Sequence, residues 1–189
     1  MKIVLMGYMG SGKTAMGKYL NRMLGLKTID LDKYIEHIEE MSVSEIFRRY
    51  GEGGFREMEC FHLRQIMADE DNFVLSLGGG TPCFKGNMDF LKGKCTSVYL
   101  SASPLLLAER LACSSTKRPL LKGKTGDELL EYVRQSLSQR ERYYKMADFE
   151  LSVETLSIDE SGEALVRLIK ENGIACPPGP TNEFHLQTT

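Results

Sequence analysis

Residues 7–14 of this chain read G-Y-M-G-S-G-K-T and match the pattern G-x-x-x-x-G-K-[ST] at every fixed position. Residues 2–6 before them are mostly apolar and favour a strand, and residues 15–24 after them have the composition of a helix. A strand, a glycine-rich loop and a helix in this order are the setting in which such a loop binds phosphate. The alternative, a glycine-rich turn that ends in Lys-Thr by chance, does not explain these flanking segments.

The residue types in the loop explain how it would hold phosphate groups. Its glycines let successive backbone N–H groups turn toward one point, and the following helix adds partial positive charge at its N-terminus. Lys13 is placed to reach terminal phosphates, and the hydroxyl of Thr14 is placed to bind Mg²⁺. The loop alone does not separate a kinase from a GTPase switch or a motor.

Composition excludes several other classes of protein. The chain has 189 residues and a formal net charge of −2, so nothing draws it as a whole to nucleic acid or to an anionic membrane. It contains no apolar run long enough to span a membrane. Because the N-terminus leads directly into a strand, we expect no signal peptide and a cytoplasmic location. Five scattered cysteines without a C-x-x-C pair argue against a zinc site or a disulfide framework.

The pattern of elements predicts an α/β fold. Five strands are expected at 2–6, 27–30, 73–77, 97–100 and 149–153. Further helices are expected near 33–50, 54–69, 104–112, 126–146 and 160–172. Strands that alternate with helices predict a parallel five-stranded sheet covered by helices on both faces, a three-layer fold.

Three segments interrupt this alternation or follow it. Residues 31–60 form a helical insertion between the second and third strands, which we expect to bind substrate. Residues 112–125 are polar and basic and contain Pro and Gly, which suits either a mobile lid or an ordinary surface loop. We expect one domain over 1–175 and a disordered tail over 176–189, which has few apolar residues and three prolines.

Two pairs of charged residues lie at the ends of predicted elements, one after the second strand and one at the start of a helix. Asp30 and Asp32 come after the second strand, and side chains two apart in an extended chain point the same way. One carboxylate could approach Mg²⁺ and the other an acceptor hydroxyl, although Asp32 could instead be the N-cap of the next helix. Arg56 and Glu59 share a helix face, so the carboxylate could fix the guanidinium for binding an anion. The alternative is a surface ion pair of little consequence.

Two further segments suit a ligand. Residues 78–80 are three glycines at the end of the third strand, which lets a ligand touch the backbone unless they form only a loose turn. Residues 140–144 read R-E-R-Y-Y near the end of the longest expected helix. Their arginines either complete an anion site or form a solvated basic face.

Together these segments resemble the shikimate kinase family. The matching motifs stand in the family's order: G-x-M-G-S-G-K-[ST] at 7–14, D-x-D-x-x-I-E at 30–36, G-E-x-x-F-R-x-x-E at 51–59, L-G-G-G at 77–80, R-P-L-L at 118–121 and R-x-x-x-Y at 140–144. They cover roughly residues 1–155. Each motif alone admits a simpler explanation, whereas six in order do not.

The resemblance implies a P-loop kinase fold and transfer of the γ-phosphoryl group of ATP to the 3-hydroxyl of shikimate, with Mg²⁺ as cofactor and a monomeric enzyme. It implies catalytic roles for Lys13 and Asp32, and Mg²⁺ binding by Thr14 and, through water, Asp30. The implied ATP contacts are Gly10, Ser11, Gly12, Lys13, Thr14, Ala15, Arg110 and Arg118. The implied shikimate contacts are Asp32, Arg56, Gly78, Gly79, Gly80 and Arg140.

The chain departs from the family pattern at two positions. Arg142 stands where the family often has Pro, which leaves open whether Arg140 or Arg142 meets the substrate carboxylate, and Ala15 replaces a frequent Ser or Thr. The alternative functions are another small kinase, acting on gluconate or a nucleoside monophosphate, and a non-catalytic nucleotide-dependent switch. A gluconate kinase would lack the motif at 51–59. A GTPase switch should carry N-K-x-D and a D-x-x-G after its third strand, and neither stands at the expected place.

Overall fold

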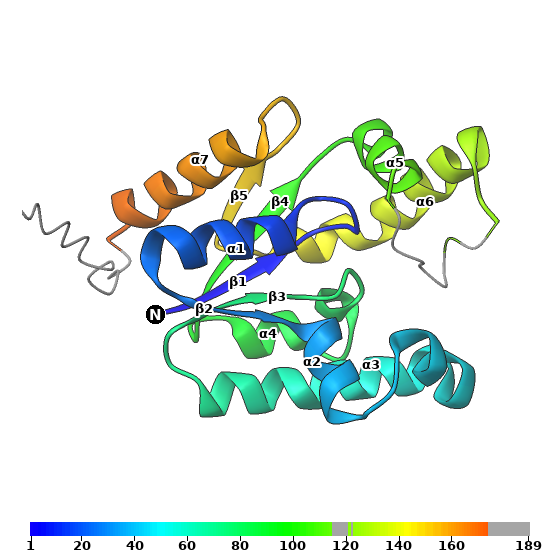
Figure 1. The fold of residues 1–189 in the computed structure, drawn as a ribbon, viewed down its shortest axis with the longest axis horizontal. Coiled ribbons are helices and arrows are strands. Elements are labelled where there is room, and N and C mark those ends of the chain that lie inside the picture. The colour runs from blue at the N-terminus through cyan, green and yellow to red at the C-terminus, as the bar shows by residue number, and fades with distance from the viewer. Residues whose placement is uncertain (115–120, 122, 174–189) are drawn as a thin grey trace, which may run out of the picture.

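A parallel five-stranded sheet forms the centre of the structure, a computed structural model that describes residues 1–114, 121 and 123–173 (Figure 1). The strands are β1 (Lys2–Met6), β2 (Lys27–Asp30), β3 (Phe73–Ser76), β4 (Thr96–Ser101) and β5 (Phe149–Ser152). Their order is β2-β3-β1-β4-β5, and every neighbouring pair is parallel. The predicted parallel sheet of five strands is therefore confirmed, with small shifts at the strand ends.

Helices cover both faces of the sheet and complete the three layers. They are α1 (Lys13–Leu24), α2 (Leu31–Ile38), α3 (Val43–Asp69), the short 3₁₀ turn η1 (Thr81–Cys83), α4 (Asn87–Leu91), α5 (Pro104–Ala112), α6 (Gly126–Tyr144) and α7 (Ile158–Glu171). Helices α1 and α7 pack on one face, and α3, α4 and α6 pack on the other (Figure 1).

Strand β1 shows how the sequence produces two cores. Ile3 and Leu5 belong to the cluster with α1 and α7, whereas Val4 and Met6 belong to the cluster with α3, α4 and α6. All four side chains are fully buried. Successive side chains of a strand point to opposite faces, so a central strand covered on both sides is apolar at every position. This burial fixes β1, and with it the loop that follows, in the middle of the molecule.

The insertion after β2 differs from its prediction. The helix expected over 33–50 is interrupted, because Glu40 adopts a left-handed conformation with φ of 51° and Ser42 starts α3 by accepting a hydrogen bond from the Glu45 N–H. Helix α3 then runs to Asp69, with non-helical dihedral angles at Gly51 (φ 68°, ψ −178°) where two separate helices were expected. The short elements η1 and α4 were not predicted.

Strand β2 leads directly into α2 through Asp30. This residue ends the strand, and its Oδ1 accepts a hydrogen bond from the Lys33 N–H at 3.4 Å, which makes it the N-cap of α2. Asp32 lies inside the first turn of the helix instead. The alternative in which Asp32 caps this helix is therefore wrong, and the Asp32 carboxylate does not serve to cap α2.

Two predicted segments lie wholly or partly beyond the structure. Residues 115–120 and 122 of the expected lid, and the tail 176–189, are outside the described residues. In the part of the chain that the structure describes, no helix is both long and apolar enough to cross a bilayer.

Candidate active site

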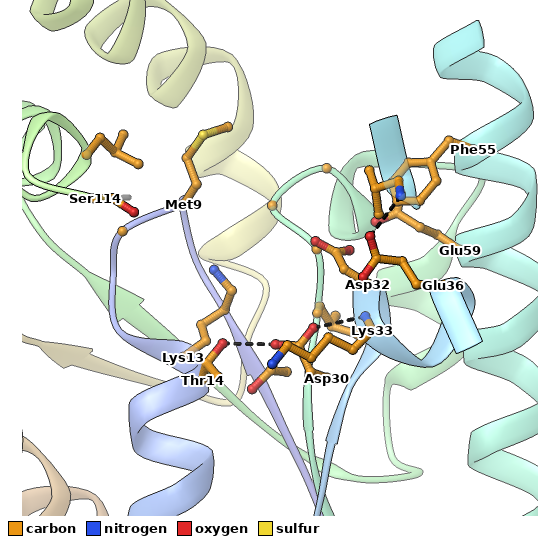
Figure 2. Close-up of a pocket in the computed structure, with 18 of the residues that line it drawn as sticks. Met9, Lys13, Thr14, Asp30, Asp32, Lys33, Glu36, Phe55, Glu59 and Ser114 are labelled. Atoms are coloured by element: carbon orange, nitrogen blue, oxygen red, sulfur yellow. Dashed lines mark hydrogen bonds between the residues drawn. The ribbon is translucent and has the colours of Figure 1, made fainter. Parts of the chain in front are cut away.

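A cleft of about 610 Å³ opens at the carboxyl ends of β1, β2 and β3 (Figure 2). Parallel sheets bind ligands at this edge because the loops that carry polar groups converge there. The predicted site residues that line it are Gly10, Gly12, Lys13, Thr14, Ala15, Asp30, Asp32, Arg56, Gly78, Gly79, Gly80, Arg110 and Arg140. We call residues 7–15 with Asp30 and Arg110 the phosphate end, and the remaining lining residues in this set the acceptor end.

The phosphate end is built on a loop whose backbone conformation requires glycine. Gly10 and Gly12 have φ angles of 86° and 96°, a region that residues with a Cβ rarely adopt. Helix α1 begins directly after Gly12, so its first N–H groups face the cleft. Ser11 does not line the cleft: its side chain is buried, and its hydroxyl has no hydrogen-bond partner within the described residues. The contact of Ser11 with nucleotide stays a prediction, and the buried side chain does not support it.

The ammonium group of Lys13 lies over this loop. Its Nζ donates hydrogen bonds to the carbonyl oxygens of Gly7 at 2.9 Å and Tyr8 at 3.0 Å. Figure 2 shows the side chain rising into the cleft from the first turn of α1. An ammonium on a flexible stem can exchange such backbone acceptors for phosphate oxygens. The loop therefore carries a positive charge where terminal phosphates would lie.

Thr14 and Asp30 form a possible magnesium site. The Thr14 hydroxyl donates to Asp30 Oδ2 at 2.9 Å, which joins the start of α1 to the end of β2 (Figure 2). No cluster of three or more His, Cys, Asp or Glu side chains suited to a metal occurs in residues 1–114, 121 and 123–173. Mg²⁺ commonly binds through one or two protein oxygens together with phosphate and water. The pair fits that kind of site.

Arg110 closes one side of the phosphate end. From α5 its guanidinium donates to the carbonyl oxygens of Gly10 at 3.5 Å and Val153 at 3.3 Å. It thus connects the glycine loop to the segment after β5. Arg118, the other arginine expected to contact ATP, lies outside the described residues.

Asp32 points into the cleft from α2 (Figure 2). Its Oδ1 is buried and accepts no hydrogen bond from any residue that the structure describes. Burial, followed by the negative charges of Glu59 and Asp30, raises the pKa of Asp32 to about 7, against the opposing charges of Lys13 and Arg56. A carboxyl group that titrates near neutral pH and has an unused oxygen is suited to bind, and to deprotonate, a substrate hydroxyl.

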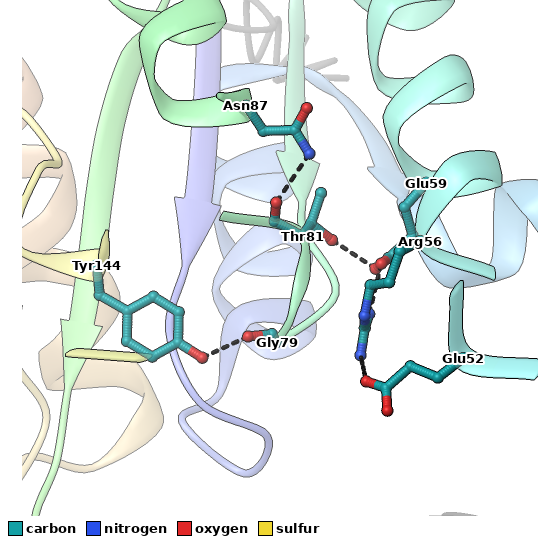
Figure 3. A network of polar contacts seen from close by, with 7 residues as sticks. All are labelled: Glu52, Arg56, Glu59, Gly79, Thr81, Asn87 and Tyr144. Atoms are coloured by element: carbon teal, nitrogen blue, oxygen red, sulfur yellow. Dashed lines mark hydrogen bonds and ion pairs between the residues drawn. The ribbon is translucent and has the colours of Figure 1, made fainter. Parts of the chain in front are cut away.

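Arg56 is buried and held between two carboxylates (Figure 3). Its Nη1 is paired with Glu59, which is fully buried, and its Nη2 donates to Glu52 at 3.0 Å. Burial is the largest single influence and works against the charge on Arg56, but the charges and hydrogen bonds of Glu59 and Glu52 together outweigh it, so the pKa of Arg56 lies above its usual value. The predicted pairing of Arg56 with Glu59 is confirmed, and it is a buried pair rather than a surface one.

The three glycines after β3 provide room for these charged groups. A Cβ on Gly80 would lie 2.3 Å from Cζ of Arg56, and a Cβ on Gly78 would lie 2.2 Å from Oε1 of Glu59 and 2.8 Å from Oδ1 of Asp32. No real Cβ comes so close to another heavy atom. The segment is therefore a close-packed wall of the acceptor end and not a loose turn.

A polar network that the sequence did not predict supports this wall (Figure 3). The Thr81 hydroxyl donates to Glu59, and Asn87 donates from its amide to the Thr81 carbonyl at 2.8 Å. On the other side, the hydroxyl of the buried Tyr144 donates to the Gly79 carbonyl. Tyr144 was part of a motif without an assigned role, and no local pattern marked Thr81 or Asn87.

The structure distinguishes the two candidate arginines of α6. Arg140 lines the cleft, and its Nη1 would be 3.6 Å from a Cβ on Gly79. Arg142 is exposed, donates to the Tyr143 hydroxyl at 3.0 Å and does not line the cleft. Of the two, only Arg140 is placed to contact a ligand there.

An apolar surface faces these polar groups, and sequence reasoning did not identify it. Phe47 and Phe55 come from opposite sides of the Gly51 break, and their ring centroids are 5.0 Å apart. Both line the cleft together with Val43. The acceptor end therefore combines arginines, a carboxylate and an apolar wall, which suits a small acid with a hydrocarbon ring and hydroxyl groups.

Known proteins resemble this chain over most of its length. The model of the shikimate kinase family matches residues 9–170. A shikimate kinase of Parabacteroides distasonis is 40% identical over 172 residues, which are 89% of this chain and 99% of that protein. One of Bacteroides thetaiotaomicron is 39% identical over 170 residues, covering 90% of this chain and 97% of that protein.

Solved structures agree with these sequence matches. The crystal structure of shikimate kinase from Bacteroides thetaiotaomicron has a TM-score of 0.84 at 38% identity and covers 89% of this chain and 98% of that one. Shikimate kinase from Acinetobacter baumannii in complex with shikimate has a TM-score of 0.83 at 29% identity, covering 92% of this chain and 95% of that one.

Proposed function

The chain belongs to the shikimate kinase family and is an enzyme that phosphorylates shikimate with ATP, and we propose that the two ends of its cleft divide this reaction between them. The observation that carries the assignment is the Asp32 carboxylate. It reaches the same glycine segment as Arg56 and faces the cleft that Lys13 also lines. A hydroxy acid held by arginines would then present a hydroxyl to Asp32.

At the phosphate end, the chain supplies positive charge and backbone N–H groups. Phosphoryl transfer needs positioning and neutralisation of charge more than covalent help. Lys13 would leave the Gly7 and Tyr8 carbonyls for the γ-phosphate, and Arg110 would lie beside the nucleotide. Arg118 is proposed to contact ATP on the strength of its motif alone.

Thr14 and Asp30 would hold Mg²⁺, Thr14 directly and Asp30 through water. The support is the 2.9 Å contact between their oxygens at the mouth of the loop. Bound there, the ion would neutralise charge on the phosphates. The protein's own part is to orient the hydroxyl and the carboxylate toward that position.

At the acceptor end, Arg56 and Arg140 would bind the shikimate carboxylate, and the backbone of residues 78–80 would contact the ring substituents. Asp32 would accept a hydrogen bond from the 3-hydroxyl and take its proton as the oxygen attacks the γ-phosphorus. The bond from the γ-phosphorus to the β,γ-bridging oxygen would break, and ADP would leave. The raised pKa of Asp32 supports this role, because a base is most effective when its pKa lies near the working pH.

A coupled assay of ADP release tests this proposal. ATP turnover should require shikimate and Mg²⁺, and D-gluconate or AMP should not replace shikimate. Equal or faster phosphorylation of gluconate or AMP would reject the acceptor assignment. Turnover without any acceptor would indicate a nucleotide hydrolase or switch instead.

We also propose that residues 1–175 form one domain and that it acts as a cytoplasmic monomer. Cysteine usage supports the location, since Cys60, Cys83, Cys95 and Cys113 are all unpaired, as is typical of a reducing compartment. Sedimentation at several protein concentrations would test the oligomeric state.

A further inference from the structure

The guanidinium group of Arg56 is paired with two carboxylates, although it has a single positive charge. Its Nη1 pairs with Glu59 and its Nη2 with Glu52, and only about a tenth of the side chain is exposed (Figure 3). Glu59 therefore neutralises the positive charge of Arg56, and Glu52 adds a second negative charge beside it. One N–H of Nη2 is thus taken by Glu52.

The two carboxylates differ in how firmly they are held. Glu59 is fully buried and also accepts a hydrogen bond from Thr81, so it has no path to water. The Glu52 side chain is 54% exposed and stands directly after the Gly51 break in α3. Rotation of its side chain would return the carboxylate to solvent, because this partner of the ion pair is half exposed and such pairs are weak. Glu52 is thus the carboxylate that can leave.

A substrate carboxylate would compete directly with Glu52. If Glu52 stayed on Arg56, a third carboxylate would join Glu52 and Glu59 around one guanidinium, with Asp32 nearby. Like charges at this distance repel, and the second arginine of the acceptor end, Arg140, offsets only one of them. The binding of an anion to Arg56 is therefore linked to the departure of Glu52.

We propose that Glu52 is an internal competitor that holds one N–H of Arg56 Nη2 until the acceptor's carboxylate replaces it. This inference rests on the proposed function of the acceptor end. A simple anion has to displace Glu52 with nothing else to gain, whereas shikimate also gains the contacts of its hydroxyl groups. Glu52 thereby lowers the affinity of the acceptor end for every carboxylate, and only a ligand with further contacts offsets this cost.

The test is shikimate binding to Glu52→Gln by calorimetry. The variant should bind shikimate about two- to fivefold more tightly, the range that corresponds to an exposed ion pair, and ATP affinity should not change. In steady state the KM for shikimate should fall in the same proportion with little change in kcat. Benzoate should become a stronger competitive inhibitor. Glu52→Ala should show the same direction of change, since it removes the competing group entirely.

Two comparisons isolate the effect. Glu45→Gln removes the matching pair with Arg49, also four residues apart on α3 and 2.7 Å long, and should leave shikimate binding unchanged. The carboxamide analogue of shikimate has no negative charge for Glu52 to repel, so Glu52→Gln should tighten its binding less than that of shikimate.

The sign of the change decides the outcome. Unchanged or weaker shikimate binding by a folded Glu52→Gln protein would overturn the proposal, because a residue that merely orients Arg56 should weaken binding when it is removed. A gain for the carboxamide as large as the gain for shikimate would overturn it too. Failure of the wild type to bind shikimate would instead reject the proposed function.

Discussion

The two ends of the cleft are built in different ways. The phosphate end comes mainly from one stretch, residues 7–15, and relies on glycine dihedral angles, a helix N-terminus and one lysine. The acceptor end takes side chains from α2, α3 and α6 and places them against the glycines after β3. One end uses backbone and local sequence, and the other uses buried side-chain charge and tertiary packing.

This difference has consequences for both stability and specificity. The phosphate end can recognise phosphate with groups that any chain possesses, so its motif occurs with many acceptors. The acceptor end holds Glu59, Arg56 and Asp32 in or near the interior, where each charge depends on its neighbours. Changes there should alter shikimate binding and folding, whereas changes at the phosphate end should alter nucleotide binding.

The largest effect is expected for Asp32→Asn, which keeps the shape of the side chain and removes its basicity. Loss of a general base should lower kcat by ~10²–10⁴-fold. Asp127→Asn is the matched control, since Asp127 also stands in the first turn of a helix but is exposed. Near-normal turnover by Asp32→Asn in the coupled assay would limit Asp32 to a structural role.

The same variant should not be less stable than the wild type near neutral pH. Folding raises the pKa of Asp32 from 3.8 to about 7, so its ionisation disfavours the folded protein progressively between these values and fully above them. Asp32→Asn lacks this penalty. Its stability relative to the wild type should therefore rise with pH from about 4 to 7. Urea unfolding without nucleotide, Mg²⁺ or shikimate measures this, and a relative stability that falls with pH would contradict it.

Lys13→Ala should be the next most harmful change and should act on the other end. Removing one group that stabilises charge in the transition state should lower kcat by ~10²–10³-fold. ATP affinity should fall as well, while shikimate binding alone should be retained. Lys18→Ala on the exposed side of α1 serves as the control. Loss of shikimate binding in Lys13→Ala would show that the two ends are not separate.

Arg56→Lys should show the reverse pattern, with shikimate affinity lowered and ATP affinity nearly unchanged. A lysine ammonium cannot replace the planar fork that pairs with Glu59 and an anion together. The loss of one charge-assisted hydrogen bond, about 1.5–3 kcal/mol, corresponds to roughly 10- to 100-fold weaker shikimate binding. Arg142→Lys should bind shikimate like the wild type in the same calorimetric titration. Equal defects in both variants would return Arg142 to the site.

The smallest effect is expected for Tyr144→Phe, which leaves the Gly79 carbonyl without its side-chain donor. Loss of this buried hydrogen bond should lower the free energy of unfolding by about 0.5–1.5 kcal/mol. Tyr143→Phe alters a more exposed hydroxyl and should change stability by less than about 0.5 kcal/mol. Urea titrations of the two variants make the comparison. A larger loss for Tyr143→Phe would mean that the wall of glycines does not depend on Tyr144.

The same contrast explains what the sequence could predict. All five strands and the loop at 7–14 were identified, because apolar runs and glycine motifs are local signals. The break at Glu40 and the short helix α4 were missed, since neither has a strong periodic pattern. Thr81, Asn87 and the Phe47–Phe55 contact were missed because their importance arises only when distant segments meet.

Where the sequence allowed two interpretations, tertiary structure decided between them. The sequence offered Asp32 as the N-cap of the next helix, and the position where β2 ends gives this role to Asp30. The pair of Arg56 and Glu59 read equally well as a surface contact. Its burial depends on the glycines after β3, which are far away in sequence.

Asp30 connects the phosphate end of the cleft to the helix that carries Asp32. One of its oxygens receives the Thr14 hydroxyl, and the other holds the first turn of α2, which carries Asp32. Any group that draws Asp30 toward the nucleotide therefore also acts on the helix turn that carries Asp32, the proposed base. Linkage of this kind is reciprocal: the factor by which nucleotide changes the affinity for the second substrate is also the factor by which that substrate changes the affinity for nucleotide. A single carboxylate thus gives the enzyme a means of cooperativity between two small molecules that bind to different segments of the chain.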